Sequence, residues 1–143
     1  MEIKVKVLNE NAVMPKYQTE FSAGCDLCSC QEQLVKAGET VLIKTGLAME
    51  IPAGFGGFIF ARSGLATKRG LAPANKVGVV DSDYRGEIMV ALHNHGKVDQ
   101  LVEKGERVAQ LVFMPISQGQ FVIAEEISQT VRGEGGFGST GKK

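Results

Sequence analysis

Short apolar runs with a period of two, divided by turn-forming residues, place the strongest constraint on the fold of this chain. In the first run, Ile3, Val5 and Val7 alternate with lysines, a pattern typical of a half-buried strand. Similar β-rich runs occupy residues 40–43, 47–51, 58–60, 88–92, 108–114 and 121–123. Turn signals separate them at intervals of roughly 8–12 residues, the spacing of a β-sandwich or barrel. The sequence therefore predicts an all-β fold.

One segment, residues 63–69, has a helical pattern, and it is about two turns long. Ser63 is the expected N-cap, Leu65 lies on the apolar side, and Gly70 is the expected stop. No repeat or linker divides the rest of the chain. We expect a single β domain over residues 1–131, followed by a separate tail over residues 132–143.

Charge and hydropathy exclude several classes of partner. Sixteen basic and sixteen acidic residues give a formal net charge of zero. Without a basic excess, neither nucleic acid nor an anionic membrane is an expected partner, and any polyanion must meet a local cluster of charge. No apolar run approaches the ~20 residues of a membrane span. We expect a soluble, cytoplasmic protein.

Three cysteines, Cys25, Cys28 and Cys30, lie within six residues of one another. An odd number at such short spacing does not form a disulfide framework. A structural zinc site needs four ligands, which His93 and His95 would have to complete. Free thiols, buried or half-buried, are the expected state.

The densest polar cluster lies between two apolar segments, at residues 81–87. Three acids, a tyrosine and an arginine there predict an exposed hairpin turn. One interpretation is a solvated turn with a surface pair between Asp83 and Arg85. The other is a catalytic turn, in which a carboxylate activates water and Tyr84 offers a flat face to a sugar or base.

Three smaller clusters also permit two interpretations each. Arg62 and Ser63 stand at a strand-to-helix junction, which would serve as a phosphate site or as a plain helix cap. Asp26, two residues after a glycine, would hold Mg²⁺ or cap a turn. Arg107 and Gln110 open a predicted strand, where polar residues need no function.

The end of the chain is rich in glycine from Arg132 onward. Glycine at this density disfavours helix and strand because each glycine loses the most backbone freedom on ordering. The same stretch carries an arginine, an aromatic ring and two hydroxyls, which suit a segment that grips phosphates and covers a planar ring. A flexible terminus without a role is the alternative.

The order and content of these segments resemble the five motifs of the trimeric dUTPase family. The matching segments are residues 23–27, 62–66, 75–87, 107–111 and 132–141, so the resemblance covers most of the chain. It implies a β jelly roll and a homotrimer whose active sites draw on more than one subunit. It also implies hydrolysis of dUTP to dUMP and pyrophosphate with Mg²⁺, which keeps uracil out of DNA and supplies dUMP for dTMP synthesis.

The resemblance also implies roles for individual residues. Asp81 would be the catalytic base, and Asp26 would hold Mg²⁺ through coordinated waters. Tyr84 would pack on the deoxyribose, and the Gly-rich tail would close as a lid over the site. The implied substrate-binding residues are Arg62, Ser63, Gly64, Asn75, Gly78, Tyr84, Gln110, Arg132, Phe137, Gly138 and Ser139.

Two other functions are compatible with the same architecture. A dCTP deaminase would need further groups around the base, and none is identifiable in the sequence. A non-catalytic dUTP-binding regulator would keep the fold and use the nucleotide as a switch. The presence of Asp81 and of the whole tail favours an enzyme over a regulator.

Overall fold

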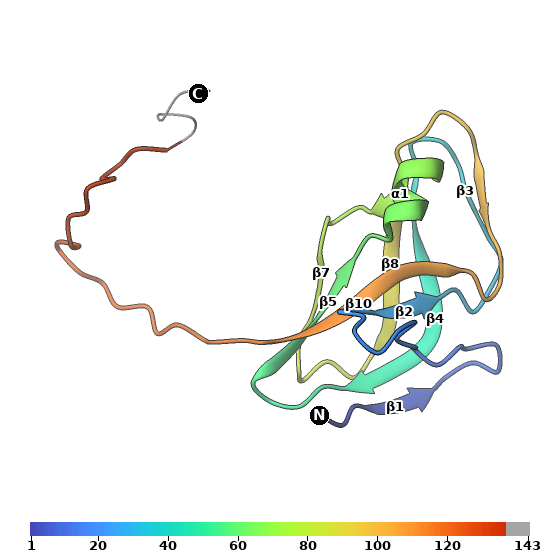
Figure 1. Cartoon of the computed structure of the whole chain (residues 1–143), viewed down its shortest axis with the longest axis horizontal. Coiled ribbons are helices and arrows are strands. Elements are labelled where there is room, and N and C mark those ends of the chain that lie inside the picture. Colours follow the sequence, from blue (N-terminus) through green and yellow to red (C-terminus); the bar gives the residue numbers. More distant parts are fainter. Residues whose placement is uncertain (137–143) are drawn as a thin grey trace.

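The structure, a computed structural model, describes residues 1–136 and confirms a fold dominated by β-strands (Figure 1). Within that range the chain forms ten strands and one helix. The strands are β1 (Lys4–Val7), β2 (Cys25–Cys28), β3 (Gln33–Val35), β4 (Thr40–Glu50), β5 (Phe55–Phe60), β6 (Leu71–Pro73), β7 (Gly78–Val80), β8 (Glu87–Asn94), β9 (Gln100–Val102) and β10 (Arg107–Pro115). The helix is α1 (Ser63–Arg69).

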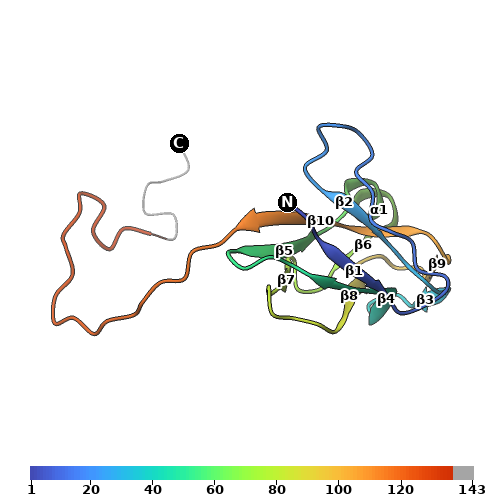
Figure 2. The same cartoon turned by 90° about the horizontal axis from the view of Figure 1, so that it is seen from below.

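The strands form two four-stranded antiparallel sheets and a small ribbon. One sheet has the order β1-β4-β8-β6, the other has the order β2-β10-β5-β7, and β3 pairs with β9. Figure 2 shows the body from below, with the tail leaving it after β10. In β8 every second residue is buried, as expected for a strand with one face on the core. The arrangement is jelly-roll-like.

The core lies between the sheets and consists of aliphatic side chains from both. Its fully buried members include Leu27, Ile43, Leu47, Val90 and Leu111. Each such side chain contributes roughly 1.5–3 kcal/mol when it leaves water. The core therefore fixes the positions of β2, β8 and β10, the strands that carry most of the polar clusters.

Two of the expected runs belong to a single strand. Residues 40–43 and 47–51 both lie mainly in β4, which continues through Gly46. Gly46 has a φ of 70°, and the register with β8 shifts between Lys44 and Ala48, as at a β-bulge. A Cβ on Gly46 would lie 2.7 Å from the Cβ of Asn9. Only glycine therefore suits this bend, and the bend does not interrupt the strand.

The predicted strand at 121–123 is wrong. Residues 116–136 contain no strand and leave the body as an extended tail (Figures 1 and 2). The side chains of Phe121 and Ile123 are 99% and 102% exposed, so this apolar segment is not buried against any part of the same chain. A strand needs a neighbouring strand for its hydrogen bonds, and this segment lies away from the body, where it pairs with none (Figure 1).

The helix forms where the sequence predicts it, but its cap differs. Arg62 occupies the N-cap position with φ −86° and ψ 127°, and no side chain caps the helix. Ser63 is instead the first helical residue, so the expected N-cap was wrong by one position. Gly70 has a φ of 67° and accordingly ends the helix in the left-handed region.

The three cysteines are free and buried, as predicted. Burial raises the pKa of each thiol, and the charge of Asp26 raises that of Cys28 further, against the opposing effect of Arg107.

Within residues 1–136 no group of three or more His, Cys, Asp or Glu side chains could hold a metal ion. His93 and His95 stack edge to face with ring centroids 4.3 Å apart. In the same range, no helix is long and apolar enough to cross a membrane.

Candidate active site

The polar clusters of the sequence gather in two separate cavities that share no lining residue. The first, called here the cationic cavity, has a volume of about 320 Å³ and is lined by Gln18, Ser22, Ala23, Gly24, Asp26, Arg62, Ser63, Gly64, Arg107 and Gln110. The second, called the hairpin cavity, has a volume of about 280 Å³ and is lined by Leu42, Ile59, Asn75, Gly78, Val79, Val80, Asp81, Tyr84, Glu87, Ile88, Met89 and Ala91.

Asp26 is the hub of the cationic cavity. It lies in β2 and is 9% exposed, with both carboxylate oxygens occupied. Arg62 Nε lies 3.0 Å from Oδ1, and Arg107 Nη1 lies 3.2 Å from Oδ2. Gln18 Nε2 also donates to Oδ2, at 2.8 Å. The carboxylate thereby holds two guanidinium groups side by side, each with donors to spare.

Gln110 stands beside this hub because β10 pairs with β2. The register places it opposite Asp26, and its Nε2 donates to the carbonyl of Ala61 at 2.8 Å. A Cβ on Gly24 would lie only 3.2 Å from Gln110 Oε1, so a glycine there leaves room for the amide. The backbone entering α1 is consequently tied to β10.

The charge of the cationic cavity is positive overall, with two guanidinium groups against one carboxylate. This pair of arginines suits a polyanion, because the N–H groups of a guanidinium can donate two parallel hydrogen bonds to phosphate oxygens. Asp26 is the one carboxylate among the described residues that line it. The donor set therefore does not form a metal cage, but it fits Mg²⁺ that arrives on a phosphate chain and keeps most of its waters.

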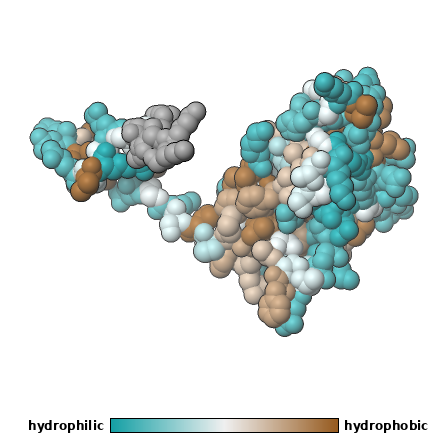
Figure 3. Space-filling model, turned by 45° about the horizontal axis from the view of Figure 1, so that its top comes forward, coloured by the Kyte–Doolittle hydropathy of each residue, from teal (hydrophilic) through white to brown (hydrophobic). Residues whose placement is uncertain are grey.

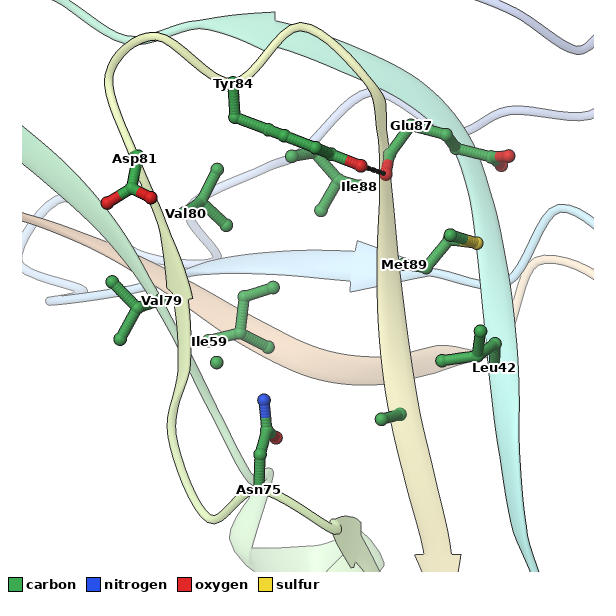
Figure 4. Close-up of a pocket in the computed structure, with 12 residues that line it drawn as sticks. Leu42, Ile59, Asn75, Val79, Val80, Asp81, Tyr84, Glu87, Ile88 and Met89 are labelled. Carbon is green, nitrogen blue, oxygen red and sulfur yellow. Dashed lines mark hydrogen bonds between the residues drawn. The ribbon is translucent and has the colours of Figure 1, made fainter.

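The hairpin cavity lies between β7 and β8, where the turn 81–86 connects them (Figure 4). Its walls are mainly aliphatic, from Ile59, Val80 and Ile88. Asn75 directs its amide into the cavity from one end, and Asp81 and Tyr84 lie at the other. An apolar slot with a few polar groups at its ends is the usual form of a small-molecule site.

Tyr84 is held in one orientation by its own turn. Its hydroxyl donates to the carbonyl of Glu87 at 3.0 Å, the bond drawn in Figure 4. A Cβ on Gly86 would lie 2.4 Å from the tyrosine oxygen, so the ring can lie over the backbone only because residue 86 is glycine. The ring is thus a preformed flat surface at the mouth of the cavity.

The surface pair considered for this turn does not form. Arg85 Nη1 donates instead to the carbonyls of Ser82, at 2.7 Å, and Tyr84, at 3.0 Å. Asp83 is exposed and lies outside the hairpin cavity. Arg85 therefore stabilises the turn itself, and Asp81 is the aspartate of the turn that lines the cavity.

Comparisons with known proteins agree with this arrangement. The dUTPase family profile matches residues 10–141. A deoxyuridine 5'-triphosphate nucleotidohydrolase of Desulfitobacterium hafniense is 51% identical, with 97% of each chain covered. This chain belongs to the dUTPase family.

Solved structures of dUTPases show the same fold. A dUTPase of Staphylococcus bacteriophage 80alpha with dUPNHPP has a TM-score of 0.93 at 31% identity, covering 98% of each chain. A dUTPase from phage phi11 of S. aureus, described for its coordination of a structural Mg(II) ion, has a TM-score of 0.82 at 26% identity, covering 88% of this chain and 98% of that one.

Some residues implied by the dUTPase resemblance lie elsewhere. Arg132 is in the tail and lines neither cavity, and its Nε donates to the carbonyl of Gly135 at 2.8 Å. Phe137, Gly138 and Ser139 lie outside the described residues. The structure thus brings Asp26, Arg62, Ser63, Gly64 and Gln110 into one cavity and Asn75, Gly78, Asp81 and Tyr84 into the other.

Five of the residues that line the cationic cavity were assigned no role from the sequence: Gln18, Ser22, Ala23, Gly24 and Arg107. Arg107 was recognised as part of a dUTPase motif but was given no role, although its charge near Gln110 was a usable signal. No sequence pattern marks Gln18. Its side chain lies close to Asp26 because the backbone of Lys16, two residues earlier, forms an isolated β-bridge with Asp26.

Proposed function

We propose that this chain hydrolyses dUTP to dUMP and pyrophosphate by attack of water on the α-phosphorus. Membership of the dUTPase family and the high identity to a named dUTP nucleotidohydrolase support this substrate and reaction. The observation that carries the mechanism is the division of polar groups between the cavities: paired guanidinium groups line one, and a carboxylate and an aromatic ring line the other.

Asp81 is the proposed general base. It lies directly after β7, and its carbonyl accepts the backbone N–H of Tyr84 at 3.2 Å, which shapes the turn. Its carboxylate lies at the edge of an apolar cavity, where it can receive a proton from a water held beside the substrate. A carboxylate in this role orients the water as well as deprotonating it.

The hairpin cavity is the proposed nucleoside site. The amide of Asn75 can pair with the edge of uracil. A glycine suits position 78 because a Cβ there would lie 3.2 Å from the Cβ of Ile59, in the wall of the cavity. Tyr84 would pack on the deoxyribose and leave no space for a 2′-hydroxyl. A tight apolar slot also disfavours the methyl group of thymine, at a cost of about 1–3 kcal/mol.

The cationic cavity is the proposed phosphate site. Arg62, Ser63, Gly64 and Gln110 would contact the phosphate chain, and Asp26 would contact waters of its Mg²⁺. Bound Mg²⁺ neutralises charge that develops on the phosphate oxygens. Since Asp26 already engages two guanidinium groups, a contact through water suits it better than direct coordination.

A homotrimer is the proposed assembly, with each site built from more than one subunit. The two cavities share no residue within one chain, so a site that uses both is best completed between chains. Exposed apolar residues support such contacts, notably Leu42 at 57% and Val79 at 63% on the body. Figure 3 shows apolar surface on the side of the body from which the tail departs, and the tail itself is apolar at several positions.

The Gly-rich end is the proposed lid. Residues 132–143 would close over bound nucleotide, with Arg132 on the phosphates, Phe137 over uracil, and Gly138 and Ser139 supplying backbone and hydroxyl donors. Closure that depends on the substrate would exclude water from the site only when the triphosphate is present. The boundary at residue 131 and a cytoplasmic location stay predictions.

The decisive measurement is pyrophosphate release from dUTP with Mg²⁺, run beside dTTP, dCTP and UTP. Release from dUTP alone is the expected result, and it would establish base and sugar selectivity together. Deamination of dCTP would instead indicate the deaminase activity. Tight dUTP binding without release from any of the four would contradict the proposal and support a regulator.

A further inference from the structure

The two ends of α1 are tied to two consecutive residues, Glu106 and Arg107. At the start of the helix, Arg62 Nη1 donates to the carbonyl of Arg107 at 3.1 Å. At its last residue, Arg69 forms an ion pair with the carboxylate of Glu106. The helix is therefore fastened at both ends to the point where the turn after β9 meets β10.

Arg69 uses the whole of its guanidinium fork in this attachment. Nε donates to Gln100 Oε1 at 2.8 Å, Nη2 donates to the carbonyl of Leu101 at 2.6 Å, and Nη1 meets Glu106. The side chains of Arg69 and Glu106 are 30% and 23% exposed, so solvent screens the pair only in part. Because the guanidinium group is planar and each of its three nitrogens has its own acceptor, these contacts fix the orientation of the group as well as its position.

Glu106 is fixed from the other side as well. Its Oε2 accepts the backbone N–H of Glu103 at 3.0 Å, and its carbonyl accepts that of Ser29 at 2.9 Å. These bonds close the turn and set the start of β10. Because Arg107 is the next residue, its side chain leaves this fixed point toward Asp26.

The helix has little else to orient it. It has seven residues, no side-chain cap and one buried residue, Leu65. A helix of two turns has marginal stability of its own, so its position depends on tertiary contacts. At the start of the helix these contacts are made by Arg62 and by the bond from Gln110 to Ala61. At its end, Arg69 joins the helix to Glu106, the residue before Arg107.

We propose that Arg69 and Glu106 form a positioning pair for recognition of the triphosphate. They hold Arg62 and Arg107 at the spacing at which both guanidinium groups meet one phosphate chain. Neither residue of the pair lines the cationic cavity, so neither touches the substrate. The inference rests on the proposed function, which places the phosphates in that cavity.

The test compares binding of the analogue dUPNHPP with binding of dUMP, which lacks the β- and γ-phosphates. R69Q should raise the Kd of dUPNHPP about tenfold, because a small displacement of the paired arginines weakens every phosphate contact. The Kd of dUMP should change less than about twofold. E106Q should have the same effect, and the double variant should lose no more than either single one, since the two side chains act as one unit.

R69K serves as the second variant if R69Q does not fold, as judged by circular dichroism. It keeps the charge without the fork, and an increase of about threefold in the Kd of dUPNHPP is expected. K4Q is the matched control, because Lys4 forms an exposed ion pair with Glu50 at 3.2 Å on the opposite sheet. It should change neither affinity.

R62Q separates the inference from the function on which it rests. If R62Q weakens dUPNHPP binding but the variants at Arg69 and Glu106 do not, the positioning pair is refuted and the phosphate site stands. If R62Q has no effect, the phosphate site itself is refuted. An equal loss of dUMP and dUPNHPP binding in R69Q would mark a general structural role and would also overturn the inference.

Discussion

Arg62 and Asp26 form the ion pair that joins α1 to β2, with Arg62 Nε 3.0 Å from Oδ1. The carboxylate is 12% exposed, whereas the two arginines that face it are more open to solvent, at 27% and 46%. An incoming phosphate chain can therefore reach the guanidinium groups without displacing Asp26. The aspartate holds two like charges together, so its removal should have a measurable effect.

Replacing Asp26 by asparagine should reduce both stability and the response to Mg²⁺. The two guanidinium groups would lose their shared counter-charge, at a cost of about 2 kcal/mol for a pair that is partly buried. Thermal unfolding should detect a fall of several degrees in Tm. The Mg²⁺ concentration for half-maximal pyrophosphate release should rise about tenfold. Glu50→Gln, which breaks the exposed pair with Lys4, is the control; an equal loss of stability there would remove the special role of Asp26.

Asp81→Asn should separate binding from catalysis. Asparagine keeps the size of the side chain and the turn, so the Kd of dUPNHPP should stay within about twofold of the original. Turnover of dUTP should fall about 10²–10⁴-fold, the range for a lost general base. Asp83→Asn is the matched control, since Asp83 lies in the same turn but outside the cavity. Unchanged turnover in Asp81→Asn would reject the assignment.

Sequence patterns predicted the longer strands and the helix. The period-two run at 88–92 became β8, and the helix began and ended within one residue of its expected bounds. Pattern analysis missed β2, because all four of its residues are buried and no alternation marks it. It also missed β3, β6, β7 and β9, because three residues are too few to show a period. At 121–123 the error is the opposite one: the alternation is present, but the segment is exposed and pairs with no strand of the same chain.

The candidate site was predictable in its residues but not in its contacts. The dUTPase motifs identified most of the side chains that line the two cavities. That Asp26 and Arg107, 81 residues apart, form an ion pair depends on the register between β2 and β10, which no local pattern encodes. The separation of the two cavities likewise follows from the topology of the sheets, and it became visible only with the fold.

Deletion of residues 132–143 should abolish turnover and leave the body, and the proposed trimer, folded. The tail beyond Thr130 makes only local hydrogen bonds among the described residues, so the body should not depend on it. Circular dichroism and sedimentation should be unchanged, while pyrophosphate release from dUTP is lost. A truncated chain with full activity would refute the lid.

The apolar segment that precedes the lid should govern assembly. Ile123→Asp places a charge at a position that is 102% exposed in the single chain. If this segment packs on a neighbouring subunit, the charge must be buried on assembly, and the trimer should dissociate at micromolar concentration. Sedimentation velocity measures this directly. Glu125→Gln, in the same segment, is the control that should leave assembly unchanged, and an intact trimer in Ile123→Asp would contradict the proposed packing.

Stability should fall at alkaline pH because of the buried thiols. Burial raises the pKa of Cys25, Cys28 and Cys30 in the folded chain, whereas thiols in the unfolded chain ionise near ~8.5. Above that pH the folded state binds more protons than the unfolded state. The contribution of the thiols to stability is therefore complete below ~8.5 and is lost as the pH rises through the folded pKa values.

The comparison that tests this is the slope of Tm against pH for the original chain and for a triple Cys→Ala variant. Alanine lowers the stability at every pH because it leaves small cavities, but it removes the thiol titration and should make the slope between about pH 8 and 9.5 shallower. The range stops there because the pKa of Tyr17 is also raised, by burial and by Cys25, and its ionisation would add a similar slope at higher pH. Equal slopes in the two proteins would show that the thiols ionise as readily in the folded chain as in the unfolded one.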